Sequence, residues 1–343
     1  MKTIIIGGGL AGLYAAYRLQ KAGQDYLLLE ASDHFGGRAS GWAISETNEL
    51  ELGATWVWKD FNPTLFELLD ELGLTYFDHP AGATIYDSKV EGKSILNRPY
   101  SAGQRLVGGM PQLIKALVKR LNPHKLHLNQ AVSQVTLKGK LLVTTADQQF
   151  VGDRLFLAIP PRLAAQRINF QPSLPDDVMS DWSEQETWMA PHAKLIYHFD
   201  RPFWRKQGLT GDVISDAGPM FEIHDISDEA GQFGALFGFS SLSPDERSQL
   251  TDQEQLEAGL VQLEGYFGSD IRKYLKASLL KDWTQDTFLA TEADKLAKGH
   301  QFKSAQAVAS GAWKYQLRGI ASEFSPSYPG YLAGALEATD LAL

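Results

Sequence analysis

The first thirty residues constrain the fold more than any other stretch of the chain. Thr3 to Ile6 form a short run rich in β-branched residues, which predicts a strand buried on both faces. This run continues into Gly7-Gly8-Gly9-Leu10-Ala11-Gly12, which fits the pattern G-x-G-x-x-G. From Leu10 to Leu19 apolar residues recur at helical spacing, and Gly23 marks the end of that helix.

A second apolar strand, Tyr26 to Leu29, ends in the acidic residue Glu30. Strand, glycine turn, helix, strand and terminal carboxylate together form the βαβ unit that binds dinucleotides. The phosphates of the ligand lie at the N-terminus of the helix, where N–H groups and the helix dipole attract negative charge. Glu30 would accept hydrogen bonds from ribose hydroxyls and repel a 2′-phosphate. The sequence therefore predicts NAD or FAD as the cofactor, and not NADP.

Each glycine of the motif has its own physical task. Gly7 permits the tight turn, Gly9 lets the backbone approach a pyrophosphate, and Gly12 lets the helix pack closely on the strand.

Composition excludes several classes of function. The 343 residues have 44% hydrophobic side chains, which is enough for one large or two ordinary domains. The net charge of −9 argues against nucleic acid and anionic membranes as partners. There is no cysteine, which excludes disulfides, cysteine-based metal sites and a cysteinyl link to flavin. No candidate signal peptide or membrane span is found, so we expect a cytoplasmic protein. Lone histidines such as His192, His198 and His224 have no partner spacing for metal ligands, so we expect no metal site.

Four further segments resemble a known family. Glu30-Ala31, Gly36-Gly37-Arg38 and Leu52-Gly53-Ala54-Thr55-Trp56 follow the glycine motif, and Ser327 to Ala335 contains Gly330-Tyr331 at the entry to a helix. Together they resemble the monoamine oxidase-like flavin amine oxidoreductases. The resemblance implies FAD, with Arg38 beside the pyrophosphate and the backbone of residues 53–56 along the isoalloxazine ring.

The resemblance also implies the other cofactor contacts. Val132 would hold the adenine through its backbone, Glu323 would lie by the ribityl chain, and the helix that starts near Leu332 would stabilise charge on the reduced flavin. Ala321 stands where the family usually has glycine. The expected cofactor-binding residues are Gly7, Gly9, Leu10, Ala11, Gly12, Glu30, Ala31, Gly37, Arg38, Gly53, Ala54, Thr55, Trp56, Val132, Glu323, Gly330, Tyr331 and Leu332.

Three residues are expected at the reacting end of the flavin, again from the resemblance. Lys194, anchored in register by the downstream Pro202-Phe203-Trp204, matches the lysine that holds a water against N5. On the residues alone, a surface lysine on a half-exposed strand is the competing interpretation. Tyr331 matches one wall of the family's aromatic cage, and Trp283 precedes the return to the nucleotide domain.

The positions of the family's covalent cysteine and second cage tyrosine are occupied here by Glu292 and Ala293. The FAD is therefore expected to bind non-covalently. Glu292 would pair with a cationic substrate if it faced the cavity, and otherwise is a solvated surface residue.

The fold expected is α/β, with a Rossmann-like FAD-binding domain of the GR2 flavoprotein type and an α+β substrate domain on a mixed or antiparallel sheet. Short strands at 126–128, 132–137, 141–145 and 155–159 suggest a four-strand meander. Only about thirty residues, 77–106, replace the helical substrate subdomain of longer relatives. The expected domains are residues 1–75, 104–165 and 284–343 for FAD, and residues 76–103 and 166–283 for the substrate.

The expected reaction is oxidation of a C–N bond in a small-molecule amine or amino acid by hydride transfer to flavin N5, with O2 reoxidation to H2O2. The alternatives are a flavin-dependent desaturase or C–C oxidase, and a flavoprotein that acts with a macromolecular partner. A homodimer in which the partner subunit covers the cavity is possible. An amino acid would need an arginine for its carboxylate, and five candidates are not separated by spacing: Arg98, Arg105, Arg162, Arg201 and Arg205.

Overall fold

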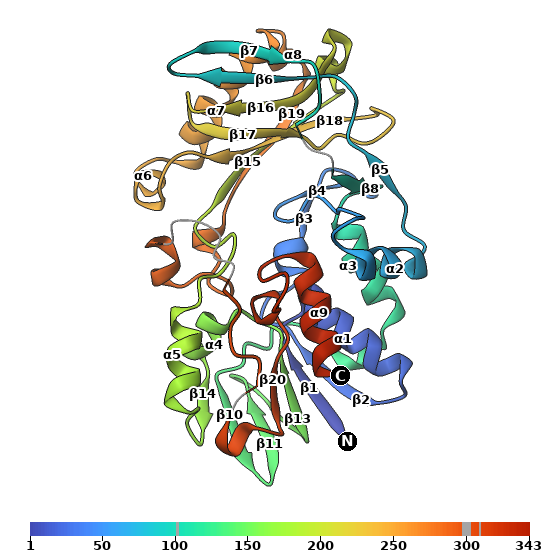
Figure 1. Cartoon of the computed structure of the whole chain (residues 1–343), viewed down its shortest axis with the longest axis vertical. Helices are drawn as coiled ribbons and strands as arrows, with labels where there is room; N and C mark the ends of the chain where they lie inside the picture. Colours follow the sequence, from blue (N-terminus) through green and yellow to red (C-terminus); the bar gives the residue numbers. More distant parts are fainter. Residues whose placement is uncertain (101–102, 297–302, 309) are drawn as a thin grey trace.

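The computed structural model describes residues 1–100, 103–296, 303–308 and 310–343. Its two main sheets lie at opposite ends of an elongated molecule (Figure 1). The lower part holds the two ends of the described chain, and the upper part is a large sheet with helices packed on it.

A five-stranded parallel sheet organises the lower part, with the order β20-β13-β1-β2-β9. The expected βαβ unit is present as β1, α1 and β2, and Gly7 follows β1 directly. The strands of this sheet are β1 (Lys2–Ile6), β2 (Asp25–Leu29), β9 (Leu126–His127), β13 (Arg154–Leu157) and β20 (Leu317–Gly319).

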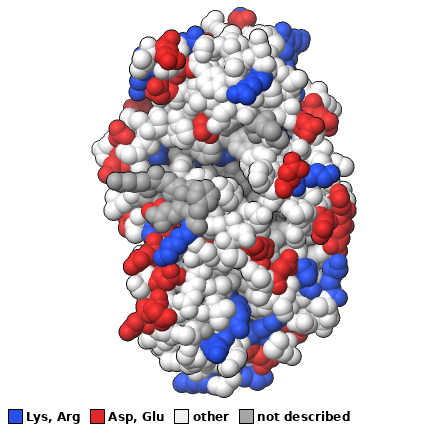
Figure 2. Space-filling view, viewed as in Figure 1, with Lys and Arg blue, Asp and Glu red and all other residues white. Residues whose placement is uncertain are grey.

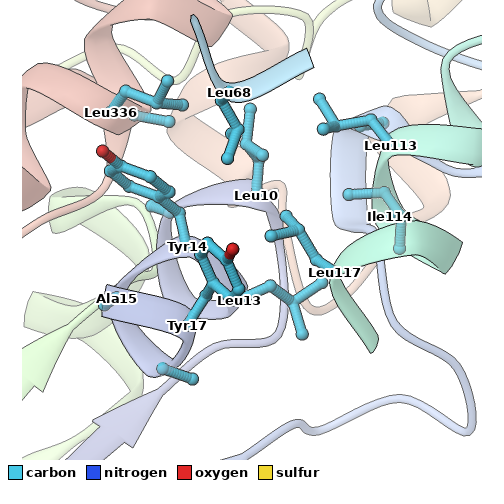
Figure 3. Close-up of a cluster of buried hydrophobic side chains, with 14 of the residues drawn as sticks. Leu10, Leu13, Tyr14, Ala15, Tyr17, Leu68, Leu113, Ile114, Leu117 and Leu336 are labelled. Carbon is cyan, nitrogen blue, oxygen red and sulfur yellow. The ribbon is translucent and has the colours of Figure 1, made fainter. Parts of the chain in front are cut away.

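Helices α1 (Leu10–Lys21), α2 (Pro63–Leu72), α3 (Pro111–Arg120) and α9 (Leu332–Ala342) pack against one another beside the parallel sheet. Figure 3 shows Leu13 and Tyr17 of α1 beside Leu117 of α3 in the core of this layer. The N-cap position of α2 is Asn62, a residue type common there, but its side chain makes no capping hydrogen bond.

The second sheet of the lower part has four strands, in the order β12-β11-β10-β14. The predicted meander is therefore wrong: β9 and β13 pair in parallel with β2 and β1, and only two of its four strands, β10 and β11, pair side by side. The strands are β10 (Gln134–Lys138), β11 (Lys140–Thr144), β12 (Gln149–Gly152) and β14 (Asn169–Gln171), accompanied by α4 (Pro161–Arg167) and α5 (Asp176–Glu184).

A seven-stranded sheet forms the upper part, with the order β19-β15-β18-β17-β16-β6-β7. It is mixed, because β16 and β6 run parallel while the other neighbours are antiparallel. The strands are β6 (Ala83–Ser88), β7 (Gly92–Leu96), β15 (Ala193–Phe199), β16 (Leu209–Ser215), β17 (Met220–Asp225), β18 (Gly234–Ser240) and β19 (Leu275–Asp282). The expected α/β fold with a second domain on a mixed sheet is confirmed.

The helices of the upper part are α6 (Pro244–Ser248), α7 (Asp252–Phe267) and α8 (Ile271–Tyr274). Ser243 and Thr251 start α6 and α7 with complete capping boxes, which satisfy backbone N–H groups at both helix starts. The apolar face of α7 contributes Leu260 and Leu263 to the core of this part.

The segment that joins the two parts consists of strands. β5 (Tyr76–Asp78) pairs with β8 (Gln104–Leu106), and β6 and β7 between them form a hairpin that extends the seven-stranded sheet. A small hairpin of β3 (Gly41–Ala43) and β4 (Glu49–Glu51) lies next to this junction (Figure 1). Within residues 76–100 and 103–106 there is no helix, so this stretch supplies no helical layer over the substrate side.

The domain division given above stays a proposal, part of which falls on residues outside the described ranges. Within the described ranges, β14 pairs with β10 and α5 packs on α4. We therefore propose that residues 169–184 belong to the same domain as the four-stranded sheet. In the described part of the chain, the helices are too short or too polar to cross a membrane.

Candidate functional site

A cavity of about 830 Å³ lies between the parallel sheet and the seven-stranded sheet. Figure 2 shows the surface hollowed where the two parts meet. Gly7, Gly9, Leu10 and Ala11, most of residues 29–40 and Val132 line one end of the cavity, and residues from β15, β17, β18 and β19 line the other. The N-terminus of α9 also reaches it through Gly330, Tyr331 and Leu332.

At Gly7 and Gly12 the glycine motif packs too closely to leave room for a side chain. Gly7 has φ +107°, and a Cβ there would lie 2.6 Å from the carbonyl oxygen of Ala158. A Cβ on Gly12 would lie 1.9 Å from the carbonyl oxygen of Gly7, so α1 packs directly on the turn. A Cβ on Gly9 would lie 3.8 Å from its nearest neighbour, the carbonyl oxygen of Gly36, so there is open space at the start of α1.

Glu30 lies at the cavity edge, where the backbone fixes its carboxylate. Its Oε2 accepts a hydrogen bond from the N–H of Gly8 at 2.5 Å, and its Oε1 accepts one from the N–H of Ser32 at 2.8 Å. Each oxygen keeps a further lone pair, so the carboxylate can still accept hydroxyl groups from a ligand.

Arg38 lines the cavity and is held from behind by Glu323. The guanidinium donates two hydrogen bonds to the carboxylate, Nη1 to Oε1 at 2.6 Å and Nη2 to Oε2 at 3.0 Å. Burial alone would raise the pKa of Glu323, but the charge of Arg38 holds it below its usual value. Because Glu323 does not line the cavity itself, we propose that it acts through Arg38.

Lys194 is fully buried on β15 and lines the opposite end of the cavity. Its Nζ donates to the carbonyl oxygen of Gly53 at 2.6 Å and to Oγ1 of Thr55 at 3.1 Å, and lies 3.7 Å from the ring centroid of Phe237. Burial disfavours the ammonium ion and lowers the pKa of Lys194 to about 7. The surface-lysine interpretation is therefore wrong.

Aromatic side chains enclose the same end. Trp283 is buried and donates its Nε1–H to the carbonyl oxygen of Leu52 at 3.2 Å, while Lys281 lies 4.2 Å from its ring centroid. Tyr331 is the N-cap residue of α9 and is 37% exposed. Other aromatic residues that line the cavity are Trp56, Trp58, Trp188, Phe221, Phe239 and Phe288.

Glu222 on β17 also lines this end and was missed from the sequence. Its side chain is one-third exposed, at 33%, and its Oε2 lies 3.5 Å from Nε2 of His224. The signal that could have found it is an acidic residue inside the apolar strand from Met220 to His224. A register shift between Met220 and Glu222 marks a β-bulge, and both Phe221 and Glu222 reach the cavity.

Other charged candidates lie elsewhere. The side chain of Glu292 is 88% exposed and pairs with Lys295, so the solvated-residue interpretation is confirmed. None of the five candidate arginines lines the cavity. Arg105, Arg162 and Arg205 are paired with acidic partners, while Arg98 and Arg201 are exposed.

Comparison with known families agrees with this geometry. A family model described as flavin containing amine oxidoreductase matches residues 86–339, and one described as NAD(P)-binding Rossmann-like domain matches residues 5–72. The chain belongs to the flavin-containing amine oxidoreductases.

The individual relatives have low sequence identity to this chain, but the matches cover most of both chains. A probable flavin-containing monoamine oxidase A of Dictyostelium discoideum is 25% identical over 70% of this chain and 74% of its own length. Putrescine oxidase of Kocuria rosea is 22% identical over 94% and 90%. The solved structure of wild-type putrescine oxidase bound to putrescine has a TM-score of 0.81 and 19% identity, covering 100% of this chain and 98% of the other. Cyclohexylamine oxidase from Brevibacterium oxydans IH-35A has a TM-score of 0.81 and 17% identity, covering 99% and 97%.

As a flavin amine oxidoreductase this protein uses FAD, and its residues fit that cofactor. The open space at Gly9 and the guanidinium of Arg38 suit a pyrophosphate, and the carboxylate of Glu30 suits ribose hydroxyls. Of the expected site residues, the cavity brings together every one except Gly12 and Glu323, which support Gly7 and Arg38 from behind. No cysteinyl link to the flavin can form, because the chain has no cysteine.

Replacing Gly12 with alanine should abolish FAD retention. The added Cβ would meet the carbonyl oxygen of Gly7 at 1.9 Å, so α1 must move away from the turn that faces the phosphates. The measurement is the flavin absorbance per mole of protein after incubation with excess FAD. Gly265→Ala is the matched control, because a Cβ there would meet nothing nearer than 3.6 Å. Equal flavin content in Gly12→Ala and wild type would contradict this account of the motif.

Proposed function

We propose that this flavoprotein oxidises a C–N bond in a small cationic amine that carries a second charged nitrogen. The observation that carries the proposal is the cavity's combination of the buried Lys194 with the carboxylate of Glu222 inside an aromatic enclosure. The relatives' names support it, since the matched proteins include putrescine and cyclohexylamine oxidases.

An amine fits the cavity better than an amino acid does. Among the described residues, the arginines that line the cavity are Arg38 and Arg167. Arg38 is engaged by Glu323, and Arg167 is the last residue of α4, next to Ile168, which packs in the same core cluster as Val132. The guanidinium whose charge acts on Lys194, that of Arg105, is paired with Glu51 and does not line the cavity, whereas Glu222 offers a negative charge to an ammonium group.

The chemistry divides between the cofactor and the chain. FAD, when bound, supplies the two-electron acceptor that takes hydride at N5 and is reoxidised by O2 to give H2O2. The substrate loses a hydride from the carbon next to nitrogen and a proton from nitrogen, and water hydrolyses the resulting imine. The chain's part is to orient the amine between Trp283 and Tyr331 and to hold Lys194 where its Nζ can bind water.

The proposal has two parts that concern the protein's surroundings. The absence of cysteine supports the proposed cytoplasmic location, because disulfides are rare in that compartment. A homodimer would cover the cavity mouth, where Phe288 is 45% exposed.

Purified protein should be reduced anaerobically by a diamine such as putrescine and should release H2O2 in air. The measurement is bleaching of the flavin absorbance across a panel of diamines, monoamines and amino acids, followed by a peroxide assay. Bleaching by an apolar polyene without peroxide would favour a desaturase instead. Reduction by a co-purifying protein, and by none of the small molecules, would favour a macromolecular partner.

Replacing Lys194 with methionine should slow flavin reoxidation by O2 about 100-fold, the usual scale for a lost proton-transfer group. In wild type the rate should change as the pH crosses about 7, the pKa of Lys194, and this dependence should vanish in the variant. The measurement is stopped-flow reoxidation from pH 5.5 to 9. Lys276→Met, on the exposed edge of β19, is the control.

The same variant separates catalysis from folding. Because the pKa of Lys194 falls from 10.5 to about 7 on burial, the unfolded state binds more protons between these values, and wild-type stability falls as the pH drops through that range. Methionine removes this cost, so the variant should be at least as stable at pH 6. Wild-type reoxidation kinetics in a folded Lys194→Met protein would remove the catalytic assignment.

Replacing Glu222 with glutamine should raise KM for putrescine about tenfold, the scale of one lost charge-assisted hydrogen bond. KM for butylamine, which has no second nitrogen, should stay unchanged. Steady-state peroxide assays measure both constants. Glu292→Gln is the matched control, since that side chain is 88% exposed. Equal effects on both amines would show that Glu222 does not recognise the second nitrogen.

A further inference from the structure

Behind Glu222 four titratable side chains form a continuous row that leads away from the cavity. His79 Nε2 lies 2.8 Å from Oδ2 of Asp212, and Oδ1 of Asp212 lies 3.2 Å from Nδ1 of His224. Nε2 of His224 in turn lies 3.5 Å from Oε2 of Glu222. Of the four, Glu222 alone lines the cavity.

The strand register builds this row. Glu222 and His224 are two positions apart on β17, so both side chains point to the same face of the sheet. The pairing of Val213 with Ile223 on the neighbouring strand places Asp212 opposite His224. The bulge at the start of β17 then directs Glu222 into the cavity. The arrangement is therefore fixed by backbone pairing.

Burial leaves His224 few partners. It is 1% exposed, with the ring of Trp56 edge-on at 4.7 Å and the rings of Phe237 and Tyr100 at 5.4 and 5.7 Å. The ionisable groups that face it are Asp212 from β16, Glu222 on its own strand and the hydroxyl of Tyr100, with His79 beyond Asp212.

The charges of the row are set by these contacts. Burial alone would raise the pKa of Asp212, but the two imidazoles hold it well below its usual range. Burial alone would lower the pKa of His224, but hydrogen bonds to Asp212 and Glu222 raise it above its usual value. A doubly protonated imidazole can donate to both carboxylates at once, whereas a neutral one can donate to only one of them.

We propose that Asp212 and His224 are positioning residues that hold the Glu222 carboxylate toward the cavity for the second ammonium group of the substrate. This inference rests on the proposed function of the site. His224 bridges the two carboxylates as an imidazolium, and Asp212 balances its positive charge. One negative charge therefore remains at Glu222 to attract a cation.

The arrangement has a pH dependence with a definite sign. When the imidazolium of His224 loses one of its two ring protons, the remaining proton stays on Nδ1, in the hydrogen bond to Asp212. Nε2 then presents a lone pair to Glu222. The carboxylate is repelled from its position, so diamine binding should weaken as the pH rises through the pKa of His224. A monoamine does not use Glu222. Both substrates share the titration of the reacting nitrogen, so this titration cancels in the ratio of KM for the diamine to KM for the monoamine.

The experiment compares putrescine and butylamine with the FAD-loaded enzyme from pH 6 to 9. His224→Gln should raise KM for putrescine about tenfold, as expected for a lost charge-assisted hydrogen bond, and should abolish the alkaline rise in the KM ratio. Asp212→Asn should move that rise to lower pH, because the imidazolium loses its balancing charge. KM for butylamine and the flavin content should match wild type in both variants.

Two controls separate positioning from a general structural effect. His198→Gln changes a histidine on β15 of the same sheet, outside the row and outside the cavity lining, and should leave the KM ratio unchanged. In a Glu222→Gln background, His224→Gln should have no further effect on the KM ratio, because the residue it positions no longer carries charge.

The result that would contradict the positioning role differs from the result that would contradict the proposed function. If wild type oxidises both amines and His224→Gln leaves the KM ratio and its pH dependence unchanged, the positioning role is wrong while the proposed function stands. The same holds if the effect of His224→Gln persists in the Glu222→Gln background. If no amine reduces the wild-type flavin, the proposed function falls and this inference falls with it.

Discussion

The buried guanidinium of Arg105 holds the two halves of the cavity at a fixed separation. It pairs with Glu51 at the end of β4, Nη2 to Oε1 at 3.1 Å, and donates to the carbonyl oxygens of Ile226 and Ser227 just after β17. One side chain thus joins the segment that leads to Gly53 with the strand that carries Glu222. A buried ion pair adds little to stability by itself, but breaking it leaves an uncompensated charge, so its geometry is strongly enforced. A second contact across the same junction is the hydrogen bond from Nζ of Lys194 to the carbonyl oxygen of Gly53.

The parts of this structure that were predictable from sequence are those whose signal is local. The opening βαβ unit follows from a glycine pattern and two short apolar runs, and the capping boxes at Ser243 and Thr251 each lie within four residues. The meander prediction failed because pairing is a long-range property. Strands β9 and β13 are short and apolar, and nothing within them says that they join β2 and β1.

The same distinction explains what was missed in the site. The lysine on β15 was found through a family motif, whereas Glu222, His224 and Asp212 have no spacing that identifies them. Their meeting depends on the register between β16 and β17 and on one bulge, and both are settled only when the sheet forms. A histidine and two carboxylates spread over two strands look, in sequence, like ordinary polar residues of a half-exposed sheet.

The electrostatic balance around Lys194 and Glu222 supports the proposal of a substrate whose two nitrogens differ in protonation. Lys281 and Asp286 both line the cavity and pair with each other at 3.2 Å, so together they add little net charge. Burial favours the neutral form of Lys194, and the charge of the His224 imidazolium beside Glu222 is balanced by Asp212, so one negative charge remains at Glu222. A charged nitrogen gains most beside Glu222. The nitrogen next to the reacting carbon must be neutral to release hydride, and the aromatic rings around Trp283 disfavour its charged form. The proposed diamine substrate would satisfy both requirements at once, because one of its ends can stay protonated while the other is desolvated.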